Sequence, residues 1–449
     1  SDDAGGVQVL TAGAVVATGD VVIEGSDLTI TNMPGVFDAV FIQADGSNNQ
    51  VDAEGSLTIQ SRTTTNVDAD IIIQGNINSD SGPLEITANR DVVMAAEAVT
   101  GAGNITITAG NNMGPSGGVH VTAGGLINSA GSVTLTGSDL TSSMGVLDSV
   151  RIDADGANDQ VLAAGGITIE AGANAPMDAD VIINGNLHST AGDIDLTAER
   201  NILLSANITA DAGAVDYNSG LILTGSSVVT AGTTATFAAT IDDDGVGGTD
   251  SELEVSAVGT TRFNAAIGSM AAIDSLLTNN GGETEVNGNI TAVNDIQFDD
   301  AVVLTNSVTM TSTTGDILFM NTLDADTALN EGLTLSASMG DILFDDAVGT
   351  TELATLTIST VIDMTANATV NVGSLTQTAG TGTTTFNSSL ITSQLGGIDL
   401  TGNEFTFGDS TGDDTVTTTG DGTVTISNSG LLEIASSANF MLDGEFMQS

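Results

Sequence analysis

The chain has 449 residues, with 58 acidic and 5 basic side chains and a formal net charge of −53. Such a charge excludes nucleic acid and anionic membrane surfaces as expected partners, because both would be repelled. Aromatic residues make up 3% of the chain and apolar residues 40%. With abundant glycine, threonine and β-branched residues, this composition predicts an all-β protein rather than a disordered chain. The absence of cysteine excludes disulfides and thiol chemistry.

The predicted elements are short strands that end in turns. In chain order, clear examples lie within residues 131–138 (GSVTLTGS), 192–199 (GDIDLTAE), 315–321 (GDILFMN) and 422–429 (GTVTISNS). Apolar and polar residues alternate in each run, which places Val, Ile, Leu and Phe on one face of a strand and Thr, Ser and Asp on the other. No run is apolar for long enough to predict a membrane span.

Internal repeats organise the chain. Residues 35–60 match residues 145–170, and residues 67–93 match 177–203, both at an offset of 110. We therefore predict tandem units at 1–117 and 118–228, a degenerate third unit at 229–330, and Thr-rich degenerate repeats with an apolar C-terminal segment at 331–449.

Strand-sized repeats at fixed spacing, with glycine corners and almost no proline, predict a parallel β-helix, or β-solenoid. We expect about 20 rungs of about 20 residues each. The phenylalanines at 298, 319 and 344 recur at 21 and 25 residues, as expected for neighbouring rungs. A tandem β-sandwich array is the alternative, and it would require longer hairpins with Asn-Gly turns.

The runs LTAGAVVATGDVVIEGSDLTI (10–30), NITITAGNNM (104–113) and GNLHSTAGDIDLTAERNILLSANITADAG (185–213) resemble the repeats of filamentous-haemagglutinin-type proteins. These are repetitive β-helical surface and adhesin proteins of bacteria. The resemblance covers most of the chain in its repeat texture, and it implies a secreted or surface-exposed solenoid without a catalytic motif.

Acidic loops are the best candidates for chemistry. The loop IDADGANDQ (152–160) has a near-copy, IQADGSNNQ, at 42–50. Clustered carboxylate and amide oxygens around a glycine suit a hard cation such as Ca²⁺. The alternative is a repeated solvated turn in which Asp and Asn satisfy their own backbone. The candidate ligands are Asp45, Asn48, Asp153, Asp155, Asn158, Asp159, Asp242, Asp244, Asp250, Asp324, Asp326, Asp409, Asp413 and Asp414.

Catalysis is not predicted. The arginines are scattered, and Arg90 and Arg200 occupy equivalent repeat positions, which favours structural ion pairs with a neighbouring rung. His120 and His188 stand alone in the sequence, so a zinc site is not expected. The repeated Asn76, Asn186 and Asn289 suit a turn or an internal amide ladder, and the turn is favoured.

An uncovered solenoid end invites the addition of another chain. The last residues carry Phe440, Met441, Leu442, Phe446 and Met447, which predicts end-to-end assembly or, alternatively, a plug folded over the last rung. We therefore expect a structural subunit of a self-assembling extracellular filament or surface layer. The protein is expected to be secreted, with its signal peptide removed. Its expected partners are copies of itself, with contact to a cell surface or matrix. The alternative is an adhesin shaft that presents a binding face.

Overall fold

A computed structural model describes residues 6–25, 39–44, 49–61, 70–110, 117–138, 149–156, 158–172, 180–246, 251–279, 281–409 and 411–449. The chain divides into two compact units, Ser1–Thr234 (unit 1) and Ala235–Ser449 (unit 2). Among these residues no helix is long and apolar enough to cross a membrane.

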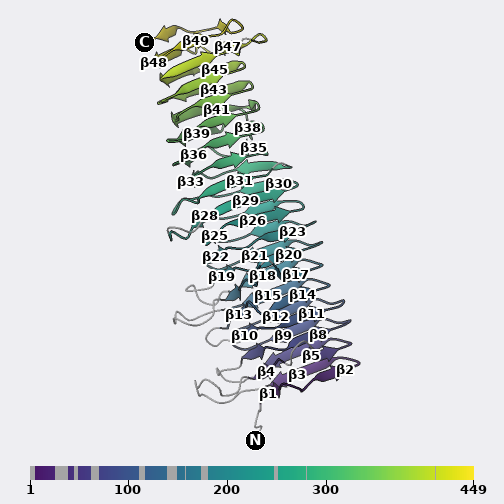
Figure 1. The fold of residues 1–449 in the computed structure, drawn as a ribbon. Coiled ribbons are helices and arrows are strands. Elements are labelled where there is room, and N and C mark those ends of the chain that lie inside the picture. Colours follow the sequence, from purple (N-terminus) through teal and green to yellow (C-terminus); the bar gives the residue numbers. More distant parts are fainter. Residues whose placement is uncertain are drawn as a thin grey trace. The chain divides into compact units, whose positions relative to one another are not determined.

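Unit 1 consists of three ladders of parallel strands, and each turn contributes one strand to each ladder (Figure 1). The first ladder contains β1 (Val7–Val9), β4 (Val40–Ile42), β7 (Ile71–Ile73), β10 (Val92–Met94), β13 (Val119–Val121), β16 (Val150–Ile152), β19 (Val181–Ile183), β22 (Asn201–Leu204) and β25 (Gly220–Leu223). The middle ladder contains β2 (Val15–Ala17), β5 (Asn49–Ala53), β8 (Asn76–Ser79), β11 (Glu97–Thr100), β14 (Leu126–Ser129), β17 (Asp159–Ala163), β20 (Asn186–Ser189), β23 (Ile208–Ala210) and β26 (Ser227–Ala231). The third contains β3 (Val21–Gly25), β6 (Leu57–Ser61), β9 (Leu84–Thr87), β12 (Ile105–Thr108), β15 (Val133–Gly137), β18 (Ile167–Ala171), β21 (Ile194–Thr197) and β24 (Val215–Tyr217).

Unit 2 has the same plan. Its first ladder contains β28 (Ile241–Asp243), β33 (Ile290–Ala292), β36 (Val308–Ser312), β39 (Gly332–Ala337), the C-terminal parts of β41 (Val348–Thr360), β43 (Val370–Gln377) and β45 (Leu390–Gly402), then β48 (Val424–Asn428) and β51 (Phe446–Gln448). The middle ladder contains β29 (Glu252–Ala257), β31 (Ser275–Thr278), β34 (Ile296–Phe298), β37 (Ile317–Phe319), β40 (Ile342–Phe344), β42 (Met364–Ala366), β44 (Thr383–Phe386), β46 (Glu404–Phe407) and β49 (Leu432–Ile434). The third contains β27 (Ala235–Phe237), β30 (Thr260–Phe263), β32 (Glu283–Val286), β35 (Ala301–Leu304), β38 (Leu323–Ala325), the N-terminal parts of β41, β43 and β45, then β47 (Thr415–Thr418) and β50 (Asn439–Met441).

These ladders confirm the predicted β-solenoid, and the β-sandwich alternative is wrong. Nine described strands form the middle ladder of each unit, slightly fewer turns than the predicted rung count. Many turns are close to the predicted length: Leu276 pairs with Ile296, and Leu187 pairs with Ile208. Longer turns, such as the one between Val15 and Val51, keep the same pairing. Within unit 1, β4–β12 recur as β16–β24 at the offset of 110 residues.

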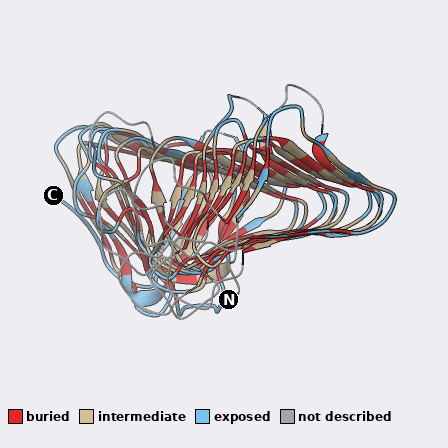
Figure 2. Ribbon diagram, turned by 90° about the horizontal axis from the view of Figure 1, so that it is seen from below, coloured by how far each residue is buried: buried red, intermediate tan, exposed pale blue. Residues whose placement is uncertain are grey.

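The core lies inside the turns because every second strand residue points inward. The pattern of buried and half-buried residues follows this alternation in most strands (Figure 2). Unit 1 is filled mainly with Val, Ile, Leu and Ala, and unit 2 adds rings. Phe298, Phe319 and Phe344 stack on successive turns, with ring centroids 5.4 and 5.3 Å apart, as their spacing indicated. Ala366 interrupts this column before Phe386 stacks on Phe407 at 5.5 Å.

Candidate functional site

The loop at Ile152–Gln160 in unit 1 begins with an ion cluster. Oδ2 of Asp153 lies 2.7 Å from Nε2 of His120, one turn away, and its Oδ1 accepts a hydrogen bond from Nε of Arg151 at 2.8 Å. Burial pushes the pKa of the Asp153 carboxyl up, but the hydrogen bonds from His120 and Arg151 and the positive charge of Arg151 outweigh it, so the pKa is lowered. His120 stands alone in the sequence, but in the structure it contacts Asp153.

Gln160 connects the described part of this loop to itself and to a neighbouring turn. The backbone N–H of Asp155 donates to Oε1 of Gln160 at 3.0 Å, and Nε2 of the buried Gln160 donates to the Gly125 carbonyl at 2.8 Å. Gly156 has a φ of 69°, in the left-handed region that favours glycine. Asp155 and Asn158 are exposed. Among the described residues, Asp153, Asp155 and Asp159 belong to no group of three or more acidic or histidine side chains that could hold a metal ion. Asp45 and Asn48, in the near-copy, lie outside the described residues.

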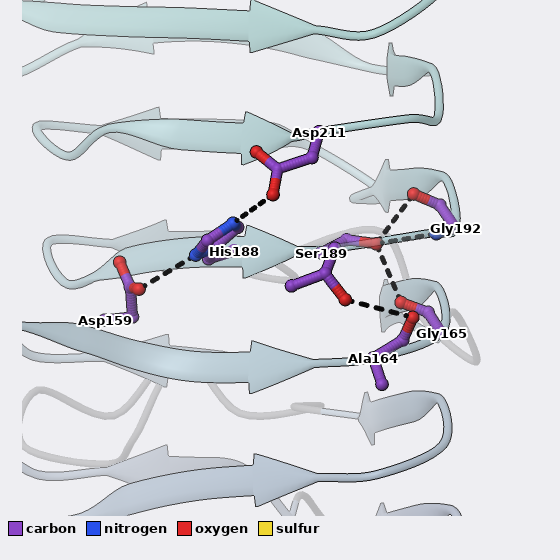
Figure 3. Close-up of polar contacts among 8 residues, drawn as sticks. Asp159, Ala164, Gly165, His188, Ser189, Gly192 and Asp211 are labelled. Atoms are coloured by element: carbon purple, nitrogen blue, oxygen red, sulfur yellow. Dashed lines mark hydrogen bonds and ion pairs between the residues drawn. The ribbon is translucent and has the colours of Figure 1, made fainter.

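His188 on β20 joins three successive turns of unit 1 (Figure 3). Its Nδ1 lies 3.0 Å from Oδ2 of Asp159 on β17, and its Nε2 lies 3.1 Å from Oδ2 of Asp211, which follows β23. Partial burial lowers the pKa of His188, but the hydrogen bonds and charges of Asp211 and Asp159 have a larger, opposite effect. The pKa of His188 is therefore raised. Because the two ring nitrogens face opposite directions, the carboxylates lie on either side of the imidazole. They therefore do not converge on a common position where a metal ion could bind both.

The next residue along β20, Ser189, serves the corner of the same turn. Its buried hydroxyl lies 2.7 Å from the carbonyls of Gly165 and Gly192 and accepts the Gly192 N–H at 3.0 Å (Figure 3). Ser79 makes the equivalent contacts, with Gly55 and Gly82. These hydroxyl groups satisfy carbonyls inside the turn, which is a structural task.

Most of the remaining predicted ligands accept hydrogen bonds from their own turn or from a neighbouring turn. Asp242 is buried and accepts the Met270 N–H at 2.7 Å, and Asp324 accepts the Thr350 hydroxyl and the Thr351 N–H, both at 2.7 Å. Asp244 accepts the Val246 N–H, and Asp326 lies 3.5 Å from the Thr327 hydroxyl. Asp409 accepts hydrogen bonds from the N–H and the hydroxyl of Thr411, and Asp414 accepts one from the Ser437 hydroxyl. Asp413 is exposed. Asp250 lies outside the described residues.

No group of three or more His, Asp or Glu side chains in the described parts of the chain is placed to hold a metal ion together. The candidate ligands in these parts therefore do not converge on one metal position. Calcium at the acidic loops stays a prediction.

The predicted arginine ion pairs are confirmed. Arg90 donates through Nε to Oδ1 of Asp70 at 2.6 Å and through Nη2 to its Oδ2, and Arg200 does the same to Asp180, with an Nε–Oδ1 distance of 2.7 Å. Both carboxylates are buried, and each pair joins two consecutive turns. Planar two-point contacts of this kind fix geometry as well as charge.

Corner residues form a polar system that the sequence patterns had not revealed. Oδ1 of Asn76, Asn186 and Asn289 accepts the backbone N–H of the following turn, at 3.2, 3.0 and 2.8 Å. Asn76 and Asn186 are the first residues of β8 and β20, so these amides bond successive turns at the start of a strand and not within a turn. In unit 2, aspartates do the same in series: Asp295, Asp316, Asp341 and Asp363 each accept the N–H one turn on, at 2.6–3.0 Å. The recurring Asp before an Ile in GDI and NDI was the available signal.

Comparison of the chain with models of protein families, with curated proteins and with solved structures finds no match.

Proposed function

We propose that this chain is a structural, non-enzymatic subunit that assembles end to end with copies of itself into an extracellular filament or surface layer. The observation that carries the proposal is the parallel stacking within each unit, in which successive turns pair and bury apolar side chains between them, while the turn of β49, β50 and β51 leaves such side chains partly exposed. Ile434 is 47% exposed and Phe446 is 44% exposed, whereas inward residues in the preceding turns are almost fully buried.

The C-terminal apolar segment is built as a further turn and is not folded back as a plug. β49 pairs with β46, β50 with β47 and β51 with β48, all in parallel register. Phe440 and Phe446 pack edge to face, with centroids 5.8 Å apart. The outer edge of such a turn presents unpaired backbone groups that another parallel strand can join.

The first turn of unit 1 offers matching strands. β1 and β51 each have three residues, and so do β2 and β49. The inward side chains of β1 and β3 are apolar, with Val9, Val21 and Ile23. Stacking a second copy would place its β1 on β51, its β2 on β49 and its β3 on β50, so that apolar side chains at each end become covered. Burial of apolar surface is the main favourable contribution to such an association.

Cations belong to this proposal because two chains of net charge −53 repel one another. Exposed carboxylates such as Asp155, Asp326 and Asp413 are available to Ca²⁺ or other cations from the medium. Electron microscopy with calcium and after chelation with EDTA tests this part. Fibres that shorten on chelation support it, and fibres indifferent to chelation leave assembly in place without calcium.

The joint itself is testable by cross-linking, because the chain has no cysteine of its own. Met447 on β51 and Gln8 on β1 point outward at the two ends. If β1 stacks on β51, their Cα atoms approach to about 4.8 Å, within the roughly 4.4–6.8 Å of disulfides. A protein carrying Met447→Cys and Gln8→Cys should form covalent oligomers on oxidation. The matched control combines Gln8→Cys with Met441→Cys on β50, which the proposed register keeps apart.

Single particles without cross-links at high protein concentration would refute end-to-end assembly. Equal cross-linking of both cysteine pairs would refute the proposed register.

A second candidate is an adhesin shaft, favoured by the outward face of the first ladder in unit 1. In-register outward positions there carry half-buried Phe41, Ile72 and Val93 and, beyond His120 and Arg151, Ile182, Leu203 and Ile222. An apolar face of this kind is typical of an interaction surface. Non-assembling rods that bind cells or matrix, and lose binding on Ile182→Asp, would favour this function.

A further inference from the structure

The outward face of the first ladder in unit 2 is a regular array of hydroxyl side chains over six successive turns, which we call the hydroxyl face. Its central column is in printed register from β36 to β48 and contains Thr309, Thr334, Thr357, Thr376, Asp399 and Thr425. On one side the flanking column contains Thr311 and Ser336, then Thr360 across a shift of register, where the Ser336 and Thr360 hydroxyls are hydrogen-bonded at 2.9 Å. It continues with Thr378, Thr401 and Ser427, and the other flanking column contains Ser307, Gly332, Thr355, Ser374, Gly397 and Thr423.

This face differs in charge from the rest of the molecule. Asp399 is the one charged residue among these positions, in a chain with 58 acidic residues. The other two ladders of unit 2 carry outward charges such as Glu254 and Glu285. Aspartates border the hydroxyl face at the next corner, where they accept backbone N–H groups between turns. A face with one charged group among these positions suits a neutral ligand.

The face is also rigid and repeats in two directions. The inward neighbours Leu335, Leu356, Ile358, Leu375 and Leu400 are buried completely. β-Branched threonine has few side-chain rotamers, so its methyl and hydroxyl groups recur in a fixed pattern. The repeat is about 4.8 Å between turns and about 6.6 Å between alternate residues of one strand. In the part of unit 2 that the structure describes, the side-chain hydroxyls of Thr309, Thr334, Thr357 and Thr376 make no hydrogen bond.

The size and chemistry of the face discriminate between occupants. It covers roughly 320 Å² from these spacings, below the about 800 Å² per partner of a stable protein interface. A second copy is therefore disfavoured. A neutral polysaccharide is disfavoured as well, because the face offers no aromatic ring for a sugar to stack against. What remains is a lattice of mostly uncharged hydrogen-bonding groups with repeats of a few ångströms, and the oxygen lattice of solid water also has repeats of this size.

We propose that the hydroxyl face binds the surface of ice crystals. The threonine hydroxyls and methyl groups order water in the pattern of the strands, and this ordered layer joins the crystal. The proposal does not depend on end-to-end assembly, because the array lies on the side of unit 2 and not on its last turn.

Inhibition of ice recrystallisation by the purified full chain tests the proposal. The informative variant is Thr357→Tyr, which places a bulky ring in the centre of the face. The matched control is Thr365→Tyr, an outward threonine of the same turn on β42 in the middle ladder. We expect the unchanged chain and Thr365→Tyr to inhibit recrystallisation equally, and Thr357→Tyr to be at least about tenfold weaker. Circular dichroism checks folding, and Thr376→Lys serves if Thr357→Tyr misfolds.

Three outcomes would overturn the proposal. One is inhibition no stronger than that of serum albumin at equal mass concentration. Another is equal loss of activity in Thr365→Tyr. The third is a dimer of the unchanged chain in sedimentation velocity that Thr357→Tyr dissociates, which would assign the face to a second copy.

Discussion

The phenylalanine column of unit 2 allows the contribution of ring stacking to be separated from burial. Phe319 and Phe386 are each 1% exposed and face inward from the middle ladder. Phe319 stacks on rings in both neighbouring turns, whereas Phe386 stacks on Phe407 and has Ala366 on its other side. Replacing either with leucine removes the same ring and leaves a side chain of similar apolar character.

Each ring pair contributes about 0.5–1.5 kcal/mol beyond burial. Phe319→Leu loses two pairs and Phe386→Leu loses one, so the free energy of unfolding should fall further for Phe319→Leu, by about 0.5–1.5 kcal/mol. Urea unfolding followed by far-ultraviolet circular dichroism measures the midpoints, with the slope checked for constancy. Because turns of a solenoid can open separately, hydrogen exchange in β37 and β44 locates the loss. Equal destabilisation, or a larger effect at Phe386, would refute the stacking argument.

Three further predictions concern charge. Arg200→Ala should lower the free energy of unfolding by about 3 kcal/mol in urea titrations, because Asp180 stays buried without its partner, and a loss under about 1 kcal/mol would contradict this. Because the folded-state pKa of His188 is raised, its stabilisation is present below the unfolded pKa and lost as pH rises through the folded value. Thermal melts should therefore show His188→Gln weakening the protein more at about pH 5.5 than at about pH 8.5, and a pH-independent difference would be evidence against its contacts with the two carboxylates. Burial and the facing charge of Asp216 raise the pKa of Asp195. Asp216→Asn should therefore raise the free energy of unfolding in urea titrations, by up to about 1 kcal/mol at low salt and less at high salt; no salt dependence would argue against repulsion.

The fold was predictable because its signals are local and periodic. Alternation within each short strand fixes which residues face inward, and the recurrence of Phe298, Phe319 and Phe344 identifies neighbouring turns. The equivalence of Arg90 and Arg200 also led to the correct kind of contact, since two copies of one repeat bury the same carboxylate in the same place.

The contacts of the histidines were not predictable in the same way. His188 contacts Asp159 in the preceding turn and Asp211 in the following one. Because these two turns differ in length, the partners do not recur at one sequence spacing. The cluster of His120 with Asp153 depends on the long turn between β13 and β16. Acidic residues in the loops looked alike in sequence, yet a buried acceptor such as Asp242 and an exposed carboxylate such as Asp413 differ only in what the neighbouring turn supplies.

The unequal turn lengths of unit 1 have a consequence for how such a chain can change over generations. Val15 is paired with Val51 and Leu187 with Ile208 in the same middle ladder, although the first turn is much longer than the second. The strand pairing is the same in both, so a difference in the number of residues between strands leaves the ladder unchanged. The corners between strands should accept foreign peptides, which makes unit 1 a scaffold for displaying epitopes.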